Sequence, residues 1–292
     1  MRPLGERLRR REPLIADGAT GTMLIARGLP PGEAPERWTL ERPSEIEQVA
    51  LAYVESGAEL LTTNTFGASP LRLRMHGLEG RTDELNARAV ELARDASDGR
   101  AYVLGSIGPT GRLLKPMGDV DHQLVLDGFR RQSAALAGAG ADAIVIETMM
   151  DLEEAAIALE AVKEEAPALP VLVTLTFDVT PRGPFTTMGV SVVSACARLQ
   201  DGGADAIGAN CGTGPEPMLA VARAFAETST LPLIFQPNAG LPMRRNGQLV
   251  YPQPPEAFAE QAARLAPLCV IVGGCCGTTP AHIAALRRRL GE

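Results

Sequence analysis

The sequence predicts a single (β/α)8 TIM barrel over residues 1–292, in which residues 1–12 form a basic lead-in. Three observations support this prediction. Eight short apolar segments recur along the chain, a segment with helical periodicity follows each of them, and eight such pairs fit into 292 residues. A doubly wound open sheet uses the same alternation and is the structural alternative.

The eight apolar segments have the composition of parallel strands that are buried on both faces. They cover residues 13–18, 59–65, 102–108, 143–148, 171–177, 206–211, 232–238 and 269–275. The segments between them place apolar residues near i, i+3, i+4 and i+7, which predicts helices. Asp151 stands where a helix cap is expected, and Pro280 where a first helical residue is expected.

A faint internal repeat supports equivalent strand–helix units. The stretches SGAELLTTNT, GAGADAIVIET and DGGADAIGANC share a glycine, an acidic turn, an apolar strand and a polar end. Gly57, Gly140 and Gly203 take the position where a helix stops. The polar residues that become equivalent in this frame are Asn64, Glu147 and Asn210.

The composition excludes several classes of protein. The formal net charge of −7 gives no electrostatic footprint for nucleic acid. No run of eighteen apolar residues is present, and no apolar run follows the basic N-terminus, so we expect neither a membrane span nor a secretory signal. Five cysteines, an odd number in a long chain, do not form a disulfide framework, and we therefore expect a cytoplasmic protein.

Polar residues stand at the ends of the predicted strands. Active sites of (β/α)8 barrels lie at the C-terminal ends of the strands. We therefore expect these side chains to converge on one rim. In order, they are Asp17, Asn64, Ser106, Glu147, Asp178, Cys211, Asn238 and the pair Cys275–Cys276.

Three of the five cysteines are candidate metal ligands. Cys211 ends the sixth strand, and Cys275 and Cys276 end the eighth, so their sulfur atoms can meet across the barrel mouth. Three thiolates suit zinc, and a fourth position left open is typical of catalytic zinc. The alternative is a chance grouping of buried thiols. Cys196, in a helical pattern, and Cys269, at the start of an apolar strand, are predicted to be core residues.

A phosphate site is a second alternative, because the Gly273–Gly274 turn resembles the glycine-rich turns that hold phosphate in barrels. It leaves the cysteine pair unexplained, and no lysine or arginine stands at the last two strand ends. A metal-dependent or phosphate-binding lyase without methyl transfer is the corresponding alternative function. The three histidines, His76, His122 and His282, fall in loops or helices and are expected to be surface or structural residues.

Seven stretches together resemble the homocysteine S-methyltransferase family: DGATGTML, TTNTFGAS, GSIGPTG, IVIET, GANCGTGP, QPNAGLP and GGCCGTTP. The resemblance extends over most of the chain and is greatest to the homocysteine-binding module of cobalamin-dependent methionine synthase. It implies a (β/α)8 barrel that holds zinc through three cysteines, here Cys211, Cys275 and Cys276. It also implies an enzyme that methylates homocysteine to methionine.

The substrate would need an acceptor for its ammonium group and donors for its carboxylate. Asp17 and Glu147 are the carboxylates that we place at the ammonium, as the resemblance also implies; the alternative is that they cap helices. Ala19 and Thr20, in GATGT, open a helix whose N–H groups can bind the carboxylate. Ser106 can add a hydroxyl group. Asn238, and less strongly Asn210, can hold a cysteine or the substrate.

The methyl donor is left open by the sequence. Methylcobalamin on a partner module is the donor that we predict, and the partner would be a corrinoid-binding or folate-binding module on another chain. S-methylmethionine, betaine and S-adenosylmethionine are the small alternatives. A corrinoid is too large to enter a barrel, so the loops at 27–38 and 108–119 would form part of a docking surface, with Trp38 and Met117 as apolar contacts. Alternatively, these loops are lids over a small donor.

Overall fold

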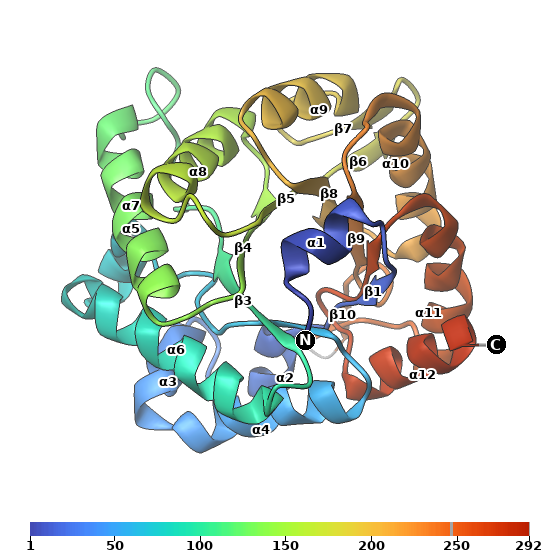
Figure 1. The fold of residues 1–292 in the computed structure, drawn as a ribbon, viewed down its shortest axis with the longest axis horizontal. Helices are drawn as coiled ribbons and strands as arrows, with labels where there is room; N and C mark the ends of the chain where they lie inside the picture. The colour runs from blue at the N-terminus through green and yellow to red at the C-terminus, as the bar shows by residue number, and fades with distance from the viewer. Residues whose placement is uncertain (246–247, 292) are drawn as a thin grey trace.

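Eight parallel strands close into a barrel in the computed structural model, which describes residues 1–245 and 248–291 (Figure 1). The sheet order is β1-β12-β9-β8-β5-β4-β3-β2, and a bridge between Ala16 and Leu60 joins the first strand to the last. This closure confirms the predicted barrel and excludes an open sheet. The strands are β1 Leu14–Ile15, β2 Leu60–Thr62, β3 Tyr102–Ile107, β4 Ala143–Met149, β5 Val171–Leu175, β8 Ala206–Cys211, β9 Leu233–Pro237 and β12 Ile271–Val272.

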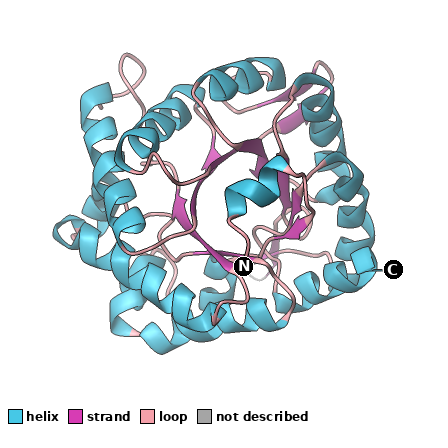
Figure 2. Cartoon of the chain, viewed as in Figure 1, coloured by secondary structure: helices cyan, strands magenta, loops and turns pink. Residues whose placement is uncertain are grey.

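Helices surround the strands as an outer ring (Figure 2). The long ones are α4 Pro43–Glu55, α6 Thr82–Ser97, α7 His122–Gly138, α8 Leu152–Glu165, α9 Val192–Asp201, α10 Pro215–Thr228, α11 Pro255–Ala262 and α12 Pro280–Gly291. Shorter segments are α2 Thr20–Ala26, α3 Trp38–Glu41, α5 Pro70–Leu73, η1 Pro35–Arg37, η2 Arg74–His76, η3 Glu79–Arg81 and η4 Ala263–Leu268. Within the described residues, no helix combines the length and the apolar character that crossing a membrane requires.

The predicted helix signals are found where the sequence places them. Asp151 caps α8, because its side chain accepts a hydrogen bond from Glu153 N at 2.9 Å. Pro280 is the first residue of α12. The three repeat glycines have φ angles of 94°, 91° and 82°, in the left-handed region that favours glycine.

Two hairpins interrupt the regular alternation and were not predicted. One pairs β6 Asp178–Thr180 with β7 Gly183–Phe185, after β5, and the other pairs β10 Met243–Arg245 with β11 Gln248–Val250, after β9. Asp178 belongs to the first hairpin and is exposed. Its prediction as a barrel strand end is therefore wrong, because β5 stops at Leu175 and the chain leaves the barrel before it reaches Asp178.

The basic lead-in contains a helix, α1 Leu4–Arg9, which lies across the central opening of the barrel in Figures 1 and 2. Leu4 and Leu8 are buried and pack in one cluster with strand residues such as Leu14 and Tyr102. The N-terminal end of the barrel is thus closed by apolar side chains from α1. Access to the barrel interior is left to the opposite, C-terminal end.

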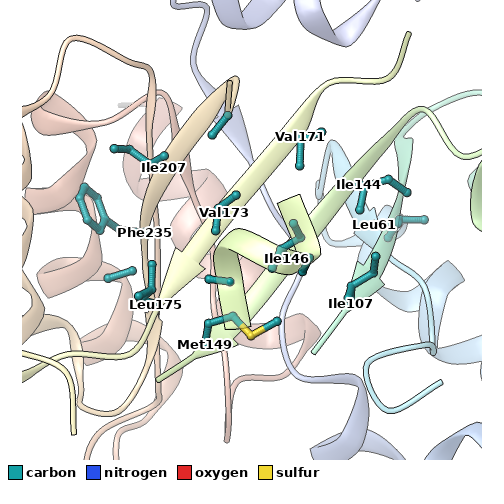
Figure 3. Close-up of a cluster of buried hydrophobic side chains, with 14 of the residues drawn as sticks. Leu61, Ile107, Ile144, Ile146, Met149, Val171, Val173, Leu175, Ile207 and Phe235 are labelled. Carbon is teal, nitrogen blue, oxygen red and sulfur yellow. The ribbon is translucent and has the colours of Figure 1, made fainter. Parts of the chain in front are cut away.

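Strand residues alternate between two apolar clusters, as the two-residue period of a strand requires. Ile144 and Ile146 belong to the cluster that packs against the helices, which Figure 3 shows in part, whereas Ala143 and Val145 belong to the cluster that includes α1. The latter cluster fills the barrel interior. Continued toward the C-terminal end, the interior positions become polar: Ser106 follows Leu104, Glu147 follows Val145, and Asn210 follows Ala206 and Gly208.

Candidate active site

The three predicted cysteines meet at the C-terminal mouth of the barrel. Cys211 is the last residue of β8, and Cys275 and Cys276 follow β12, which lies next to β9 in the sheet. The sulfur atoms of Cys211 and Cys276 are 3.9 Å apart, and all three sulfur atoms lie within 4.8 Å of one another. In the described part of the chain, this is the group of three side chains assembled closely enough to hold a metal ion.

The three thiols act on one another electrostatically. Hydrogen bonds with Cys275 and Cys276 lower the pKa of the Cys211 thiol. Those with Cys211 and Cys276 raise the pKa of Cys275, and the bond with Cys211 raises that of Cys276. The cluster therefore carries a first negative charge readily and resists a second. A divalent cation among the sulfur atoms would remove this resistance, because a coordinated thiol is deprotonated.

Asn210 connects the cysteines to the rest of the site. Its side chain is buried, and its Oδ1 accepts hydrogen bonds from Thr148 N at 2.8 Å and Thr174 Oγ1 at 2.9 Å. Its Nδ2 donates to Thr148 Oγ1 at 2.8 Å and lies 3.2 Å from Glu147 Oε2 and 3.8 Å from Cys275 Sγ. The sequence predicted only a weak supporting role for Asn210; the contacts make it the link between a carboxylate and a thiol.

Cys211 and Thr148 share an unusual backbone conformation. Both have a φ of 60°, in the left-handed region where a side chain is strained. Thr148 is held there by its two hydrogen bonds to Asn210, and the register of β4 with β5 shifts between Ile146 and Met149. This irregular backbone sets the direction of the two side chains next to it, Glu147 and Cys211, at the barrel mouth.

Asp17 offers an unused acceptor inside the cavity. Its Oδ2 accepts hydrogen bonds from Thr62 N at 2.7 Å and Thr62 Oγ1 at 2.9 Å, whereas Oδ1 is buried without a partner. Burial raises the pKa of Asp17 to about 8, and the charge of Glu147 contributes to this rise. A buried carboxylate with one free oxygen is a site for a hydrogen-bonding cation, which is the role predicted for Asp17.

Glu147 interacts electrostatically with groups on both sides: it raises the pKa of Asp17, and Cys211 raises the pKa of Glu147. Burial raises its pKa to about 7, and Cys211 adds to the rise. Ser106 Oγ donates to Glu147 Oε1 at 2.6 Å, and this bond opposes the rise. The hydroxyl proton of Ser106 is thus committed to Glu147, so the structure places Ser106 as a support for that carboxylate.

The GATGT segment forms part of the cavity wall, as expected, with α2 starting at Thr20. The N–H of Ala19 already donates to Thr278 Oγ1 at 3.2 Å. The N–H of Thr20 lies in the first turn of a helix, where backbone N–H groups have no partner within the helix. Of the two predicted carboxylate donors, Thr20 is therefore the one with the freer N–H group.

A cavity of about 460 Å³ joins these groups. The predicted site residues on its wall are Asp17, Ala19, Thr20, Ser106, Glu147, Cys211, Cys275 and Cys276. Asn64 also borders it, but its Nδ2 donates to Pro35 O at 2.8 Å and Thr39 Oγ1 at 3.1 Å, so it anchors the loop after β1. A larger hollow of about 710 Å³ lies beside α1 at the opposite end and contains none of these residues.

Two further residues contact the cysteines. Asn238 is buried, donates to Gly212 O at 3.2 Å and hydrogen-bonds the Cys211 thiol, which lowers the pKa of that thiol. Asn238 is not among the residues that line the cavity, so its contact here is with a cysteine. Tyr251 hydrogen-bonds Cys276, and no sequence signal pointed to it. It stands in an irregular segment after β11, so its position depends on the path of the loop.

Several other predictions concern residues outside the site. Cys196 is a core residue of α9, and Cys269 donates to Leu265 O at 3.2 Å beside the core. His282 is buried, with Nε2 3.0 Å from Gln253 O, which is a structural role. His122 is exposed. His76 is half-buried and lines the cavity, which the prediction of a surface or structural residue did not include.

The two side chains predicted as docking contacts differ in their exposure to solvent. Met117 is 62% exposed, as a docking contact requires. Trp38 is 2% exposed and belongs to the main core, with the Arg42 guanidinium 4.4 Å from the ring centroid. Its prediction as a surface contact is wrong, because α3 starts at Trp38 and packs this ring inward.

The glycine turn after β12 does not provide a phosphate site. Gly273 N donates to Phe235 O at 3.1 Å, and Gly274 N donates to Asp17 O at 2.9 Å. Cys275 N donates to Pro237 O at 2.8 Å. These N–H groups hold the cysteine turn against neighbouring strands, so they are not free to bind phosphate oxygens.

Comparisons with known proteins agree with this geometry. Residues 14–290 match the homocysteine S-methyltransferase family. Methionine synthases of Mycobacterium leprae and Mycobacterium tuberculosis are each 32% identical over 288 residues; the match covers 92% of this chain and 24% of each relative, so the chain spans about a quarter of their length. The homocysteine methyltransferase MmuM of Escherichia coli, solved in a metallated form, has 27% identity and a TM-score of 0.81, with 98% of this chain and 99% of that chain covered. This chain belongs to the homocysteine S-methyltransferase family.

Proposed function

We propose that the chain holds one zinc ion through Cys211, Cys275 and Cys276, and that homocysteine binds with its sulfur toward this ion and its amino-acid end toward Asp17 and Glu147. The observation that carries the proposal is the meeting of three thiols and two carboxylates, the buried Asp17 and the half-buried Glu147, on the wall of one cavity. The thiols suit a soft metal, and the carboxylates suit an ammonium group.

The spacing of the sulfur atoms fits zinc. Tetrahedral zinc with Zn–S bonds of about 2.3 Å separates its sulfur ligands by about 3.8 Å. The Cys211–Cys276 separation of 3.9 Å is close to this value, and the third sulfur lies within 4.8 Å of both. The metallated form of the Escherichia coli relative also supports a metal at this site.

When bound, zinc would supply the ionisation of the substrate thiol near neutral pH, because a coordinated thiol loses its proton. Asp17 Oδ1, which is buried without a partner, would accept one hydrogen bond from the substrate ammonium, and Glu147 would accept another. A cation there would favour the charged forms of both carboxyl groups and reverse the rise in their pKa. The N–H of Thr20 would bind the substrate carboxylate.

The methyl transfer must balance in electrons. The substrate sulfur donates an electron pair to the methyl carbon, the bond between the methyl group and its donor breaks, and that electron pair stays with the donor. The product, methionine, has a neutral thioether, which is a weaker ligand than a thiolate. Product release therefore follows from the loss of charge on the sulfur.

We further propose methylcobalamin on a partner module as the donor. Large exposed apolar side chains gather in the segments between a barrel strand and the main helix after it, or in the first turn of that helix. In the described part of the chain they are Ile25, Phe66, Met75, Leu113, Met117, Leu124, Met150, Val179, Val193, Leu241 and Met243. These segments surround the barrel mouth, and exposed apolar surface there is typical of a docking face. The methionine synthase relatives, which are about four times as long as the match, support a multi-module arrangement.

The test supplies zinc-loaded protein and homocysteine with one donor at a time: methylcobalamin, a methylated corrinoid protein, S-methylmethionine or betaine. Methionine is followed by chromatography. The proposal predicts turnover with a corrinoid donor and faster turnover when the corrinoid is carried by protein. Fast turnover with S-methylmethionine and none with either corrinoid would assign a small donor and leave the homocysteine site in place.

A further inference from the structure

The metal half and the amino-acid half of the proposed site come from opposite ends of the chain. Residues 274–278 follow β12 and carry two of the cysteines, whereas residues 17–22 follow β1 and carry Asp17 and Thr20. The two strands are neighbours where the barrel closes, and their pairing covers only two residues of each, up to Ile15 and Val272. Because this pairing stops short of the site, other contacts must fix the distance between its two halves.

One buried hydroxyl group joins the two segments. Thr278 Oγ1 accepts a hydrogen bond from Ala19 N at 3.2 Å and donates one to Cys275 O at 2.7 Å. Ala19 and Thr278 are 259 residues apart in the sequence. Thr278 is fully buried and is not among the residues that line the cavity, so its hydroxyl contacts the backbones of the two segments.

Two further hydrogen bonds run between the same segments. Gly274 N donates to Asp17 O at 2.9 Å. Gly277 N donates to Thr22 Oγ1 at 3.0 Å, so that Thr22 supplies a second hydroxyl group to the contact. The residues that bear the metal ligands and those that bear the amino-acid contacts are thus tied together at several successive positions.

Two glycines leave room for the Thr278 hydroxyl. A Cβ atom on Gly18 or on Gly274 would come within 2.4 Å of Thr278 Oγ1. Any side chain at either position would therefore push the hydroxyl away from its partners or force the segments apart. Glycine is the residue that permits such a close approach of backbone to another group, and each segment places one beside this hydroxyl.

The spacing of the two halves matters because homocysteine must reach both of them. It has two methylene groups between its Cα atom and its sulfur atom, and a ligand that bridges two sites binds tightly only when their separation matches its length. We propose that Thr278 is a positioning residue that sets this separation for a thiol with two methylene groups. The inference rests on the proposed function, which supplies the two ends that the substrate joins.

The experiment compares the whole substrate with its two parts. Calorimetry on zinc-loaded protein measures the dissociation constants of homocysteine, of norvaline, which has a methyl group in place of the thiol, and of propanethiol, which lacks the amino and carboxylate groups. The product of the two fragment constants divided by the homocysteine constant is the effective concentration of one end once the other is bound. This quantity reports the spacing of the two halves.

Thr278→Val replaces the hydroxyl by a methyl group of similar size. We expect it to lower the effective concentration about five- to thirtyfold, because the two halves lose their shared contact, while each fragment keeps its affinity. Thr278→Ser keeps the hydroxyl and should restore the value. Thr82→Val is the matched control: this threonine is also fully buried, but its hydroxyl donates to Glu79 O at 2.8 Å away from the cavity, so the effective concentration should not change.

The outcomes separate this inference from the proposed function. Unmodified protein that binds no zinc, or that binds propanethiol equally well with and without zinc, would overturn the proposed function and the inference with it. With both fragments bound, an unchanged effective concentration in Thr278→Val would overturn the inference alone. A loss of fragment affinity as large as the loss for homocysteine would do the same, since it indicates a general disturbance of the site.

Thr22→Val, which removes the second hydroxyl, carries the same prediction if Thr278→Val does not fold. It should lower the effective concentration and spare the fragments, because the bond from Gly277 N is lost. An unchanged value in a folded, zinc-loaded Thr22→Val protein would then overturn the inference.

Discussion

The Asp17→Asn substitution is expected to stabilise the folded protein and to abolish binding of its substrate. In the protein without zinc and homocysteine, burial raises the pKa of Asp17 from 3.8 to about 8. The folded state thus keeps a proton that the unfolded state releases. This stabilisation is complete below the unfolded pKa, and it is lost as the pH rises through the folded pKa.

The size of the effect follows from the shift. Between the two pKa values, the free energy of unfolding falls by about 1.4 kcal/mol for each pH unit from this group alone. Over about four pH units the loss is of the order of 5 kcal/mol, which is an upper limit because the cavity opens to water. Asparagine does not titrate, and its carbonyl can keep both bonds to Thr62, so the variant avoids this loss.

The assay is urea denaturation of both proteins in EDTA at pH values from about 4.5 to 8.5. The stability of Asp17→Asn relative to the unmodified chain should increase steadily with pH. Thr62→Val, made in the chain that keeps Asp17, removes one hydrogen-bond donor to the carboxylate. It should make the free energy of unfolding of that chain fall more steeply at high pH. A difference that stays constant, or that decreases as the pH rises, would refute the assignment of Asp17 as a buried, partly unpartnered carboxylate.

Three further outcomes test other parts of the site. Serine at any one of the proposed zinc ligands should abolish zinc binding in a metal assay, whereas Cys196→Ser and Cys269→Ser should retain it; the ligands are Cys211, Cys275 and Cys276. Glu147→Gln should weaken homocysteine binding by about 1.5–3 kcal/mol in calorimetry, because a charge-assisted bond to the ammonium is lost, and an unchanged affinity would place the ammonium elsewhere. Met117→Lys should slow turnover with a protein-carried corrinoid and leave homocysteine affinity unchanged, and equal turnover would remove this loop from the docking face.

The architecture could be predicted from the sequence because its signals are local and repeated. Apolar runs of strand length alternate with helical periodicity, and the repeat glycines have the left-handed φ angles that their position predicts. Once the barrel was predicted, its geometry alone placed Cys211 near Cys275 and Cys276, although 64 residues separate the first two. The order of strands in the barrel brings distant positions together, so no knowledge of side-chain packing was needed to predict this neighbourhood.

The remaining features depend on the course of the backbone through irregular segments, which leaves no periodic pattern in the sequence. Tyr251 reaches Cys276 from an irregular segment, and Asp178 leaves the barrel because a hairpin follows β5. Trp38 was predicted to be exposed from its place in a long loop, but a short helix turns it into the core. Asn210 stood next to a proposed ligand, yet its role depends on Thr148 and Glu147, which a one-residue irregularity in β4 brings to it.

X-ray absorption at the zinc edge tests the central claim most directly. Zinc-loaded protein alone should show three sulfur atoms at about 2.3 Å, together with one lighter ligand. Addition of homocysteine should change this to four sulfur atoms, and homoserine, which lacks the sulfur, should leave it unchanged. Zinc that keeps three sulfur ligands in saturating homocysteine would contradict the claim that the substrate sulfur binds at the metal of this cysteine cluster.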